Sequence, residues 1–226
     1  MVVDRHIEPK LARASGIALC LPHQLTEQQR MDLELRFMSS VWPVLTPLAI
    51  DKGHPFPRLR DREISLAMTL DRVEHSAVQR PVTFIVVVIP NSLDRLVAVG
   101  PMVGQAATGD VPFILLEDLV AMHIGRAFCG FRVTGCGSFR VTRARCDTPF
   151  RAEEAKDCEK PVSRIMPGQK CGQAVRLELT KDTPSEIETF LRASLGLTPV
   201  DIYRVDGPLD LRDLHRRCGW SQPPAV

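Results

Sequence analysis

The sequence predicts a single α+β domain in which a mixed, mainly antiparallel sheet is packed by three to four helices. Several stretches alternate apolar with polar residues, as half-buried strands do, and other stretches repeat apolar residues at helical spacing. The predicted strands and helices do not alternate regularly enough along the chain for a doubly wound fold. The chain has 226 residues, 44% of them hydrophobic, so it is long enough to bury a core.

The first helix is predicted to begin after Thr26, because Thr26 and Gln29 have the spacing of a capping box. The residues that recur on its expected apolar face are Leu33, Phe37 and Val41, widened by Met31, Leu35 and Met38. Pro43 is expected to end this helix. Residues 44–60 contain several prolines and are expected to form an ordered, extended connector.

The central part of the chain predicts strands. Alternation over residues 64–70 indicates a half-buried strand, and the β-branched run at 82–89 indicates a central strand buried on both faces. Shorter strands are expected at 96–99 and 112–115, followed by a helix over 117–128.

The two glycines that flank Cys136 predict a turn between two short strands, at 131–134 and 138–142. Residues 146–173 carry prolines and charges without a clean period, so a loop with at most a frayed helix is expected there. Alternation indicates a further strand at 175–179.

The last clear helix is predicted to begin with Thr183 as the N-cap and Pro184 at the first helical position, and to stop at Gly196. Its expected apolar face consists of Ile187, Phe190, Leu191 and Leu195. A final strand over 201–205 and a short helix from Asp210 complete the prediction.

Composition and charge exclude several classes of protein. Lys and Arg number 29 against 27 Asp and Glu, a net charge of +2, and only 5% of residues are aromatic, so no nucleic-acid partner is expected. No apolar run approaches the ~18 residues of a membrane span, and no secretory signal is visible, so a cytoplasmic protein is expected. The seven cysteines form no C-x-x-C pair, which favours reduced thiols.

Common catalytic templates do not occur: there is no G-x-S-x-G, no G-x-x-x-x-G-K-[ST] and no H-E-x-x-H. His123 lies on the apolar face of its helix and is expected to be a packed, hydrogen-bonded histidine. His54 is expected to have a structural role in a rigid turn. Cys20 and Cys136 lack a nearby pattern that would make either a nucleophile. We therefore assign no catalytic residue and no metal ligand.

The candidate binding residues are basic. Arg140 and Arg143 lie close together on a predicted strand, and Arg204 lies on another. Guanidinium groups suit bidentate contact with phosphate oxygens, so the three arginines form a candidate phosphate- or anion-binding site. The alternative is a charged strand edge that is only solvated.

Three stretches of the sequence carry motifs: residues 43–57, 138–143 and 201–211. The motif residues of the first and last stretches are Thr46, Pro47, Asp51, His54, Pro55, Asp206, Gly207 and Pro208. In their order and spacing these stretches resemble the head (middle) domain of bacterial polyphosphate kinase. The resemblance covers about residues 15–215, and we expect a structural role for the motif residues.

The resemblance implies a place in a four-domain enzyme that moves the terminal phosphate of ATP reversibly to polyphosphate through a phosphorylated histidine. In that family an N-terminal helical domain helps to hold the nucleotide, and the head domain contributes to dimer contacts. Two C-terminal domains carry the catalytic histidines and the magnesium site. None of the six histidines here lies in a segment that matches those catalytic motifs. We therefore expect this chain to bind neither ATP nor magnesium and to be inactive alone.

The same resemblance divides the chain into a remnant of the preceding helical region or linker (1–25), the middle domain (26–217) and a tail (218–226). The expected partners are a second copy of the chain or the catalytic domains of a polyphosphate kinase, with weak polyphosphate binding. The alternative function is a non-enzymatic dimerisation or interaction module that associates with itself or with a full polyphosphate kinase.

Overall fold

The computed structural model describes residues 17–50, 54–72, 83–100, 111–128, 130–144 and 172–212. The strands in these ranges are β1 (Ile17–Leu19), β2 (Pro47–Ile50), β3 (Ile64–Arg72), β4 (Thr83–Val88), β5 (Leu96–Ala98), β6 (Val111–Leu115), β7 (Phe131–Arg143), β8 (Ala174–Thr180) and β9 (Ile202–Val205). The α-helices are α2 (Glu27–Arg36), α3 (Leu116–His123) and α4 (Ser185–Leu195). Short turns of 3-10 or π helix are η1 (Pro22–Gln24), η2 (Phe37–Val41), η3 (Trp42–Val44), η4 (Ile124–Ala127) and η5 (Pro199–Asp201).

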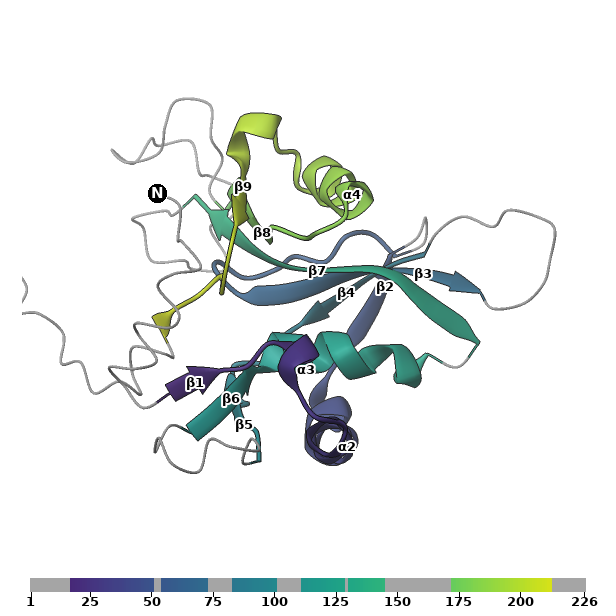
Figure 1. Cartoon of the computed structure of the whole chain (residues 1–226). Helices are drawn as coiled ribbons and strands as arrows, with labels where there is room; N and C mark the ends of the chain where they lie inside the picture. The colour runs from purple at the N-terminus through teal and green to yellow at the C-terminus, as the bar shows by residue number, and fades with distance from the viewer. Residues whose placement is uncertain are drawn as a thin grey trace, which may run out of the picture.

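The predicted α+β class is confirmed, but the strands form two sheets rather than one (Figure 1). The larger sheet has the order β2-β4-β3-β7-β8-β9 and is antiparallel except for the parallel pair β8–β9. The smaller sheet has the order β1-β6-β5, with β1 parallel to β6. The sequence does not predict β1 or β2, and β2 opens with Pro47 in a stretch whose prolines indicate a connector.

Both faces of the larger sheet are covered: α4 lies on one side, and α2, α3 and the smaller sheet lie on the other (Figure 1). The apolar cluster on the α4 side includes Val86, Phe139, Leu177, Ile187 and Leu191. The cluster on the α2 and α3 side includes Phe37, Leu66, Met68, Val87 and Leu119. Because both sides are covered, Ser65, Ala67 and Thr69 of β3 are buried too, so the prediction of a half-buried strand is wrong there.

The predicted turn around Cys136 is wrong, because β7 runs without a break through this position. A Cβ atom at Gly135 would lie 2.8 Å from Thr69 Oγ1, and one at Gly137 would lie 2.6 Å from Thr183 Cγ2. Both distances are shorter than real Cβ contacts allow. The two glycines therefore let neighbouring side chains approach the strand closely, rather than turning the chain.

The predicted capping box is confirmed. The Gln29 backbone N–H donates to Thr26 Oγ1 at 3.3 Å, and the Thr26 backbone N–H donates to Gln29 Oε1 at 2.9 Å. Leu33, Phe37 and Val41 are buried as predicted. After α2 the chain continues through η2 and η3, so the proline expected to end the helix lies inside a final 3-10 turn.

The predicted widening of this apolar face is wrong. Met31, Leu35 and Met38 are 54%, 71% and 45% exposed. Their spacing of four and three residues places them together on the outer side of the helix, away from the buried Leu33. We call these three residues the α2 stripe.

The start of α4 differs from the prediction. The N-cap is Pro184, and no side chain caps the helix. Thr183 is buried and its hydroxyl pairs with the Thr180 hydroxyl at 3.0 Å, so it faces β8 instead of the helix end. Gly196 ends the helix with φ of +66°, as predicted. The stretch 146–171, residues 1–16 and the part of the predicted C-terminal helix beyond Arg212 lie outside the described residues.

Candidate functional site

Arg140 of β7 lies in a partly buried position between two carboxylates. Its Nε donates to Glu178 Oε2 at 2.5 Å, and its Nη1 lies 3.6 Å from Asp210 Oδ2. The side chain is 19% exposed. These contacts balance the charge of Arg140 within the protein.

The other two predicted arginines have separate partners. The Arg143 guanidinium donates to the carbonyls of Leu59 at 2.7 Å and Gly172 at 2.8 Å. Arg204 of β9 donates to Glu188 Oε2 from Nη2 at 2.6 Å and from Nε at 3.0 Å. The three arginines share no acceptor among the described residues, so the structure does not gather them around one ligand position. An anion site built from all three stays a prediction.

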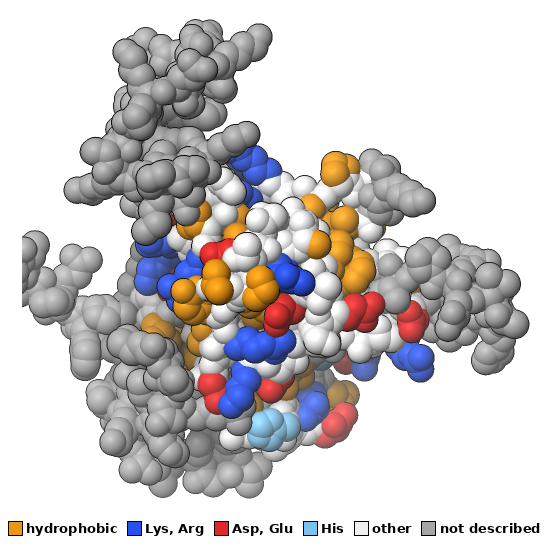
Figure 2. Space-filling view, turned by 90° about the horizontal axis from the view of Figure 1, so that it is seen from above, with side chains coloured by type: hydrophobic (Ala, Val, Ile, Leu, Met, Phe, Trp, Pro, Cys, Tyr) orange, Lys and Arg blue, Asp and Glu red, His pale blue; other side chains and the backbone are white. Residues whose placement is uncertain are grey.

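The surface seen from above α4 carries no uniform basic patch. Basic and acidic side chains are intermingled on this face (Figure 2). The contact between Lys181 Nζ and Asp206 Oδ2, at 2.8 Å, is another such exposed pair. The charge pattern here is that of a solvated surface with paired side chains.

The motif residues occupy connecting segments and one short strand. Pro47 opens β2, Thr46 precedes it, and His54, Pro55, Asp206, Gly207 and Pro208 lie in connections, whereas Asp51 lies outside the described residues. Gly207 has φ of +138°, a backbone conformation that favours glycine. This geometry supports a structural role for Gly207, and the role of the others stays a prediction.

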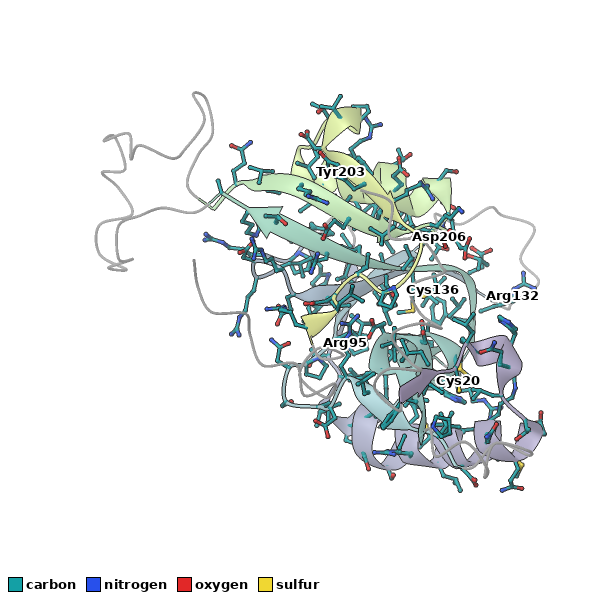
Figure 3. All side chains as sticks on the ribbon, turned by 60° about the vertical axis from the view of Figure 1, so that its left-hand side comes forward. Cys20, Arg95, Arg132, Cys136, Tyr203 and Asp206 are labelled. Carbon is teal, nitrogen blue, oxygen red and sulfur yellow. The ribbon has the colours of Figure 1, made fainter. Side chains whose placement is uncertain are left out.

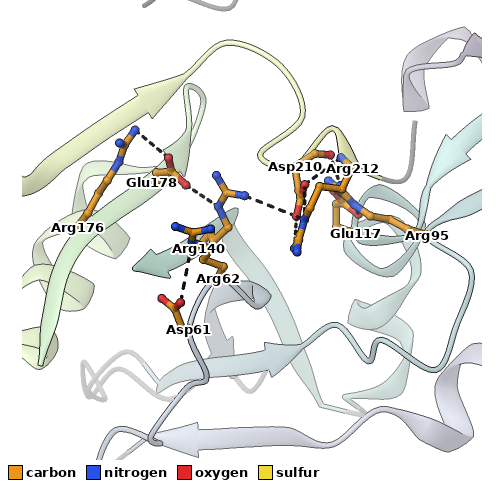
Figure 4. Close-up of polar contacts among 9 residues, drawn as sticks. All are labelled: Asp61, Arg62, Arg95, Glu117, Arg140, Arg176, Glu178, Asp210 and Arg212. Atoms are coloured by element: carbon orange, nitrogen blue, oxygen red, sulfur yellow. Dashed lines mark hydrogen bonds and ion pairs between the residues drawn. The ribbon is translucent and has the colours of Figure 1, made fainter. Parts of the chain in front are cut away.

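The main polar feature of the structure is a cluster of ion pairs that the sequence does not predict (Figure 4). We call it the Asp210 cluster. Its members are Asp61, Arg62, Arg95, Glu117, Arg140, Arg176, Glu178, Asp210 and Arg212. These residues come from the larger sheet, α3, the connections that precede β3 and β5, and the segment after β9, which explains why no local motif reveals them.

The innermost pair joins Arg95 to Glu117, whose side chains are 8% and 5% exposed. Arg95 Nε lies 3.1 Å from each oxygen of Glu117, and its Nη2 also donates to Oε1. Arg95 Nη1 donates to the backbone carbonyl of Asp210. A buried charge needs such partners, so this pair ties the segment after β9 to the smaller sheet and α3.

Asp210 joins the inner pair to the rest of the cluster. Its carboxylate accepts hydrogen bonds from Arg212 Nε at 2.8 Å and from Nη2 at 2.5 Å. Burial raises the pKa of Asp210, but the hydrogen bonds from Arg212 and the charges of Arg212 and Arg140 outweigh it and hold the pKa below its usual value. Asp210 is therefore ionised at neutral pH.

The outer end of the cluster lies at the β8–β9 edge. Arg176 Nη2 lies 2.8 Å from Glu178 Oε1, and its guanidinium carbon lies 4.0 Å from the centre of the Tyr203 ring. Tyr203 is 47% exposed and stands at the sheet edge in Figure 3. The Tyr203 ring covers one face of the Arg176 guanidinium and so helps to hold this side chain in one orientation.

A cleft of about 500 Å³ opens beside the cluster. It lies between the start of β3, the connection from β4 to β5, and the segment 210–212. Guanidinium groups and carboxylates line it together, including Arg62, Arg95, Asp94 and Asp210. The cleft has room for a small polar ligand.

The two described thiols and His123 are buried or partly buried groups. Burial, with a smaller contribution from Asp118, raises the pKa of Cys136 to about 12, and burial also raises the pKa of Cys20. Both thiols stay protonated at neutral pH, and they lie on separate elements (Figure 3). His123 is packed as predicted, with its ring 5.6 Å from that of Phe37, but its Nε2 has no hydrogen-bond partner among the described residues.

No group of three or more metal-ligating side chains occurs within the described ranges. Likewise, none of the helices found there is long and apolar enough to cross a membrane.

Comparison with known families decides the identity of this domain. The family model for the polyphosphate kinase middle domain matches residues 28–216. The chain belongs to the polyphosphate kinase family. It is 32% identical over 205 residues to the polyphosphate kinase of Neisseria meningitidis serogroup C, covering 91% of this chain and 29% of that protein. It is 34% identical over 197 residues to the polyphosphate kinase of Bacillus anthracis, covering 87% of this chain and 27% of that protein.

The fold also matches a solved polyphosphate kinase, that of Porphyromonas gingivalis. The TM-score is 0.68 at 19% sequence identity, and the match covers 97% of this chain and 31% of that one. The chain is thus a polyphosphate kinase middle domain, and it spans less than a third of the length of the relatives that it matches.

Proposed function

We propose that this chain serves as the non-catalytic middle domain of an enzyme that transfers phosphate reversibly between ATP and polyphosphate. The observation that carries the proposal is the family match over residues 28–216, since it corresponds to one domain of a longer kinase. In this role the chain binds neither ATP nor magnesium, works in the cytoplasm without a nucleic-acid partner, and associates with the catalytic domains of the kinase.

The electrostatics of the described residues support a scaffolding role. Phosphoryl transfer depends on cations that clamp the transferred group and neutralise its developing charge. In the Asp210 cluster, Arg95, Arg140 and Arg176 are instead held by carboxylates of the domain itself. Arginines bound in this way fix one segment of the chain against another.

An activity assay with purified components tests this function. The chain alone is expected to make no polyphosphate from ATP and magnesium, and to co-elute with the separately expressed catalytic domains of a polyphosphate kinase. Turnover by the chain alone contradicts the proposed inactivity. Failure to bind the catalytic domains contradicts the proposed partnership.

The α2 stripe favours a second function, self-association. If two copies of α2 pack antiparallel about a two-fold axis near Leu35, each Met31 lies close to Met38 of the second copy. The same arrangement brings the exposed Asp32 of one helix near the exposed Arg36 of the other. The helix is therefore complementary to itself in both apolar surface and charge.

Light scattering coupled to size exclusion tests the self-association. The chain is expected to elute as a dimer, and Leu35→Glu is expected to make it a monomer. Val200→Glu is the matched control, because Val200 is an 81% exposed apolar residue outside the stripe. A wild-type monomer at all concentrations, or a dimer that survives Leu35→Glu, contradicts this second function.

A further inference from the structure

The cleft beside the Asp210 cluster has features that neither the predicted arginines nor the scaffolding role explains. We call it the Arg62 cleft. Its polar lining comprises Arg62, Asn91, Asp94, Arg95, Asp210 and Arg212. Arg140, Arg143 and Arg204, the arginines singled out from the sequence, do not line it.

The sheet register places two of these side chains at the same end of one strand pair. β3 and β4 are antiparallel, with Ser65 opposite Val88, and the Ile89 backbone N–H donates to the Ile64 carbonyl at 3.0 Å. Arg62 precedes β3 and Asn91 follows β4, so both residues lie at this end of the strand pair, and both line the Arg62 cleft.

These two donors make no hydrogen bond to the rest of the described chain, although Arg62 forms a loose ion pair with Asp61. Neither the Arg62 guanidinium nor the Asn91 amide makes a hydrogen bond to a described residue. Arg62 Nε lies 3.9 Å from Asp61 Oδ2, beyond hydrogen-bond distance, while Asp61 Oδ1 accepts the Arg143 backbone N–H at 2.8 Å. The Arg62 side chain is 54% exposed, so its planar set of N–H donors faces the cleft and solvent.

The backbone of Arg62 is held in an unfavourable conformation. Its φ is +60°, and no other non-glycine residue in the described ranges has a positive φ. The Arg62 N–H donates to the Val141 carbonyl at 2.8 Å, which fixes the strained residue to β7. Such strain in a non-glycine residue gathers at binding and catalytic sites, where it sets the direction of a side chain.

The carboxylates in the lining decide which ligand fits. The Asp210 charge is already balanced by Arg212 and Arg140, and Glu117 balances Arg95. Asp94 in the lining and Asp61 beside Arg62 oppose an anion, and they limit its affinity without accepting a hydrogen bond from Arg62 or Asn91. We propose that the Arg62 cleft binds a phosphate-class oxyanion through the Arg62 guanidinium and the Asn91 amide, with Arg212 at the rim. The planar fork of a guanidinium matches two oxygens of one phosphoryl group.

Calorimetric titration of the full chain with inorganic tripolyphosphate tests the site. One saturable site is expected, with an affinity that falls as salt concentration rises. Arg62→Gly is expected to weaken binding at least tenfold, and it should fold, because glycine adopts the positive φ without strain. Asp94→Asn is expected to tighten binding severalfold, because it removes the opposing charge.

Arg126→Ala is the matched control. It removes the same charge from a 66% exposed arginine that pairs with Glu34 outside the cleft. The proposal is overturned if tripolyphosphate does not bind saturably at millimolar concentration, or if the Arg62 and Arg126 variants lose affinity equally. Acetate that binds as tightly as inorganic phosphate overturns the phosphate-class assignment. Because this titration needs no kinase activity, its result is independent of the proposed function.

Discussion

Two ion pairs of this domain have similar contacts in different surroundings. Arg95 and Glu117 are 8% and 5% exposed, whereas Arg204 and Glu188 are 37% and 28% exposed. In both pairs, two nitrogens of the arginine donate to the carboxylate. Water solvates either member of the exposed pair if the other is lost, but it solvates a remaining charge of the buried pair far less. Burial, rather than the contact itself, therefore decides what each pair contributes.

The largest expected effect comes from breaking the buried pair. Glu117→Ala leaves the Arg95 charge buried without its carboxylate and is expected to lower the free energy of unfolding by about 3–5 kcal/mol. Urea unfolding followed by circular dichroism measures it. Replacing both members with apolar residues, Arg95→Met with Glu117→Leu, should cost much less. If the double variant is as unstable as Glu117→Ala, the buried Arg95 charge is not the cause of the loss.

A smaller effect is expected at Asp210. Asp210→Asn removes the carboxylate that Arg140 and Arg212 share, but Arg212 is 69% exposed and stays solvated. The expected loss is on the order of 2 kcal/mol at pH 7. Because the folded state lowers the pKa of Asp210, its contribution is present above the unfolded pKa of about 3.9 and is lost as pH falls below it. The difference between wild type and Asp210→Asn should therefore shrink in acid unfolding curves.

His123 is a buried titratable group outside any ion pair described above, and its Nε2 has no hydrogen-bond partner among the described residues. Burial lowers its pKa, the nearby charge of Glu34 opposes this, and those of Arg126 and Arg30 add to it. Below about pH 6.5 the unfolded chain takes up the proton more readily, so the free energy of unfolding falls as the pH drops. The loss is expected to be on the order of 1 kcal/mol between pH 7 and pH 5. In His123→Leu this part of the pH dependence should disappear, and an unchanged slope would exclude His123 as its source.

The smallest effect is expected at the exposed pair. Glu188→Ala leaves Arg204 solvated and still bonded to the carbonyls of Lys181 and Thr183. The expected loss is below about 1 kcal/mol and should fade in high salt. A loss as large as that of Glu117→Ala would remove the distinction between the two pairs.

Sequence patterns predict the features that depend on neighbouring residues. The Thr26 capping box, the Gly196 helix end and the strand β8 are each signalled within a few residues, and each is found as predicted. The middle-domain family is also evident from the sequence, through three motif stretches in a fixed order.

The Asp210 cluster depends on contacts that no local pattern contains. Arg95 meets Asp210 from 115 residues away, and Arg140 meets Glu178 from 38 residues away. The sequence predicts an anion site that includes Arg140, but nothing near Arg140 in the sequence indicates the carboxylates that pair with it. Nothing in the sequence singles out Arg62, since only its φ and its place in the lining of the cleft distinguish it.

The two glycines beside Cys136 show the same limit. A glycine in a strand marks either a turn or a close approach, and the sequence alone favoured the turn. At Gly137 the close approach is made by the side chain of Thr183, a residue much later in the chain. The exposure of the α2 stripe cannot be predicted for a related reason, because apolar residues on a helix do not reveal which side the rest of the domain covers.

The unbroken course of β7 has a consequence for how the domain folds. On one side β7 pairs with β3, and on the other with β8, so it joins β2-β4-β3 to β8-β9. The β3–β7 pairing links residues far apart in the chain, such as Ile64 and Arg140, and such closures are slow compared with local hairpins. We therefore expect the arrival of β7 to limit the folding rate, and the backbone amides between β3 and β7 to exchange with solvent only when the whole domain opens.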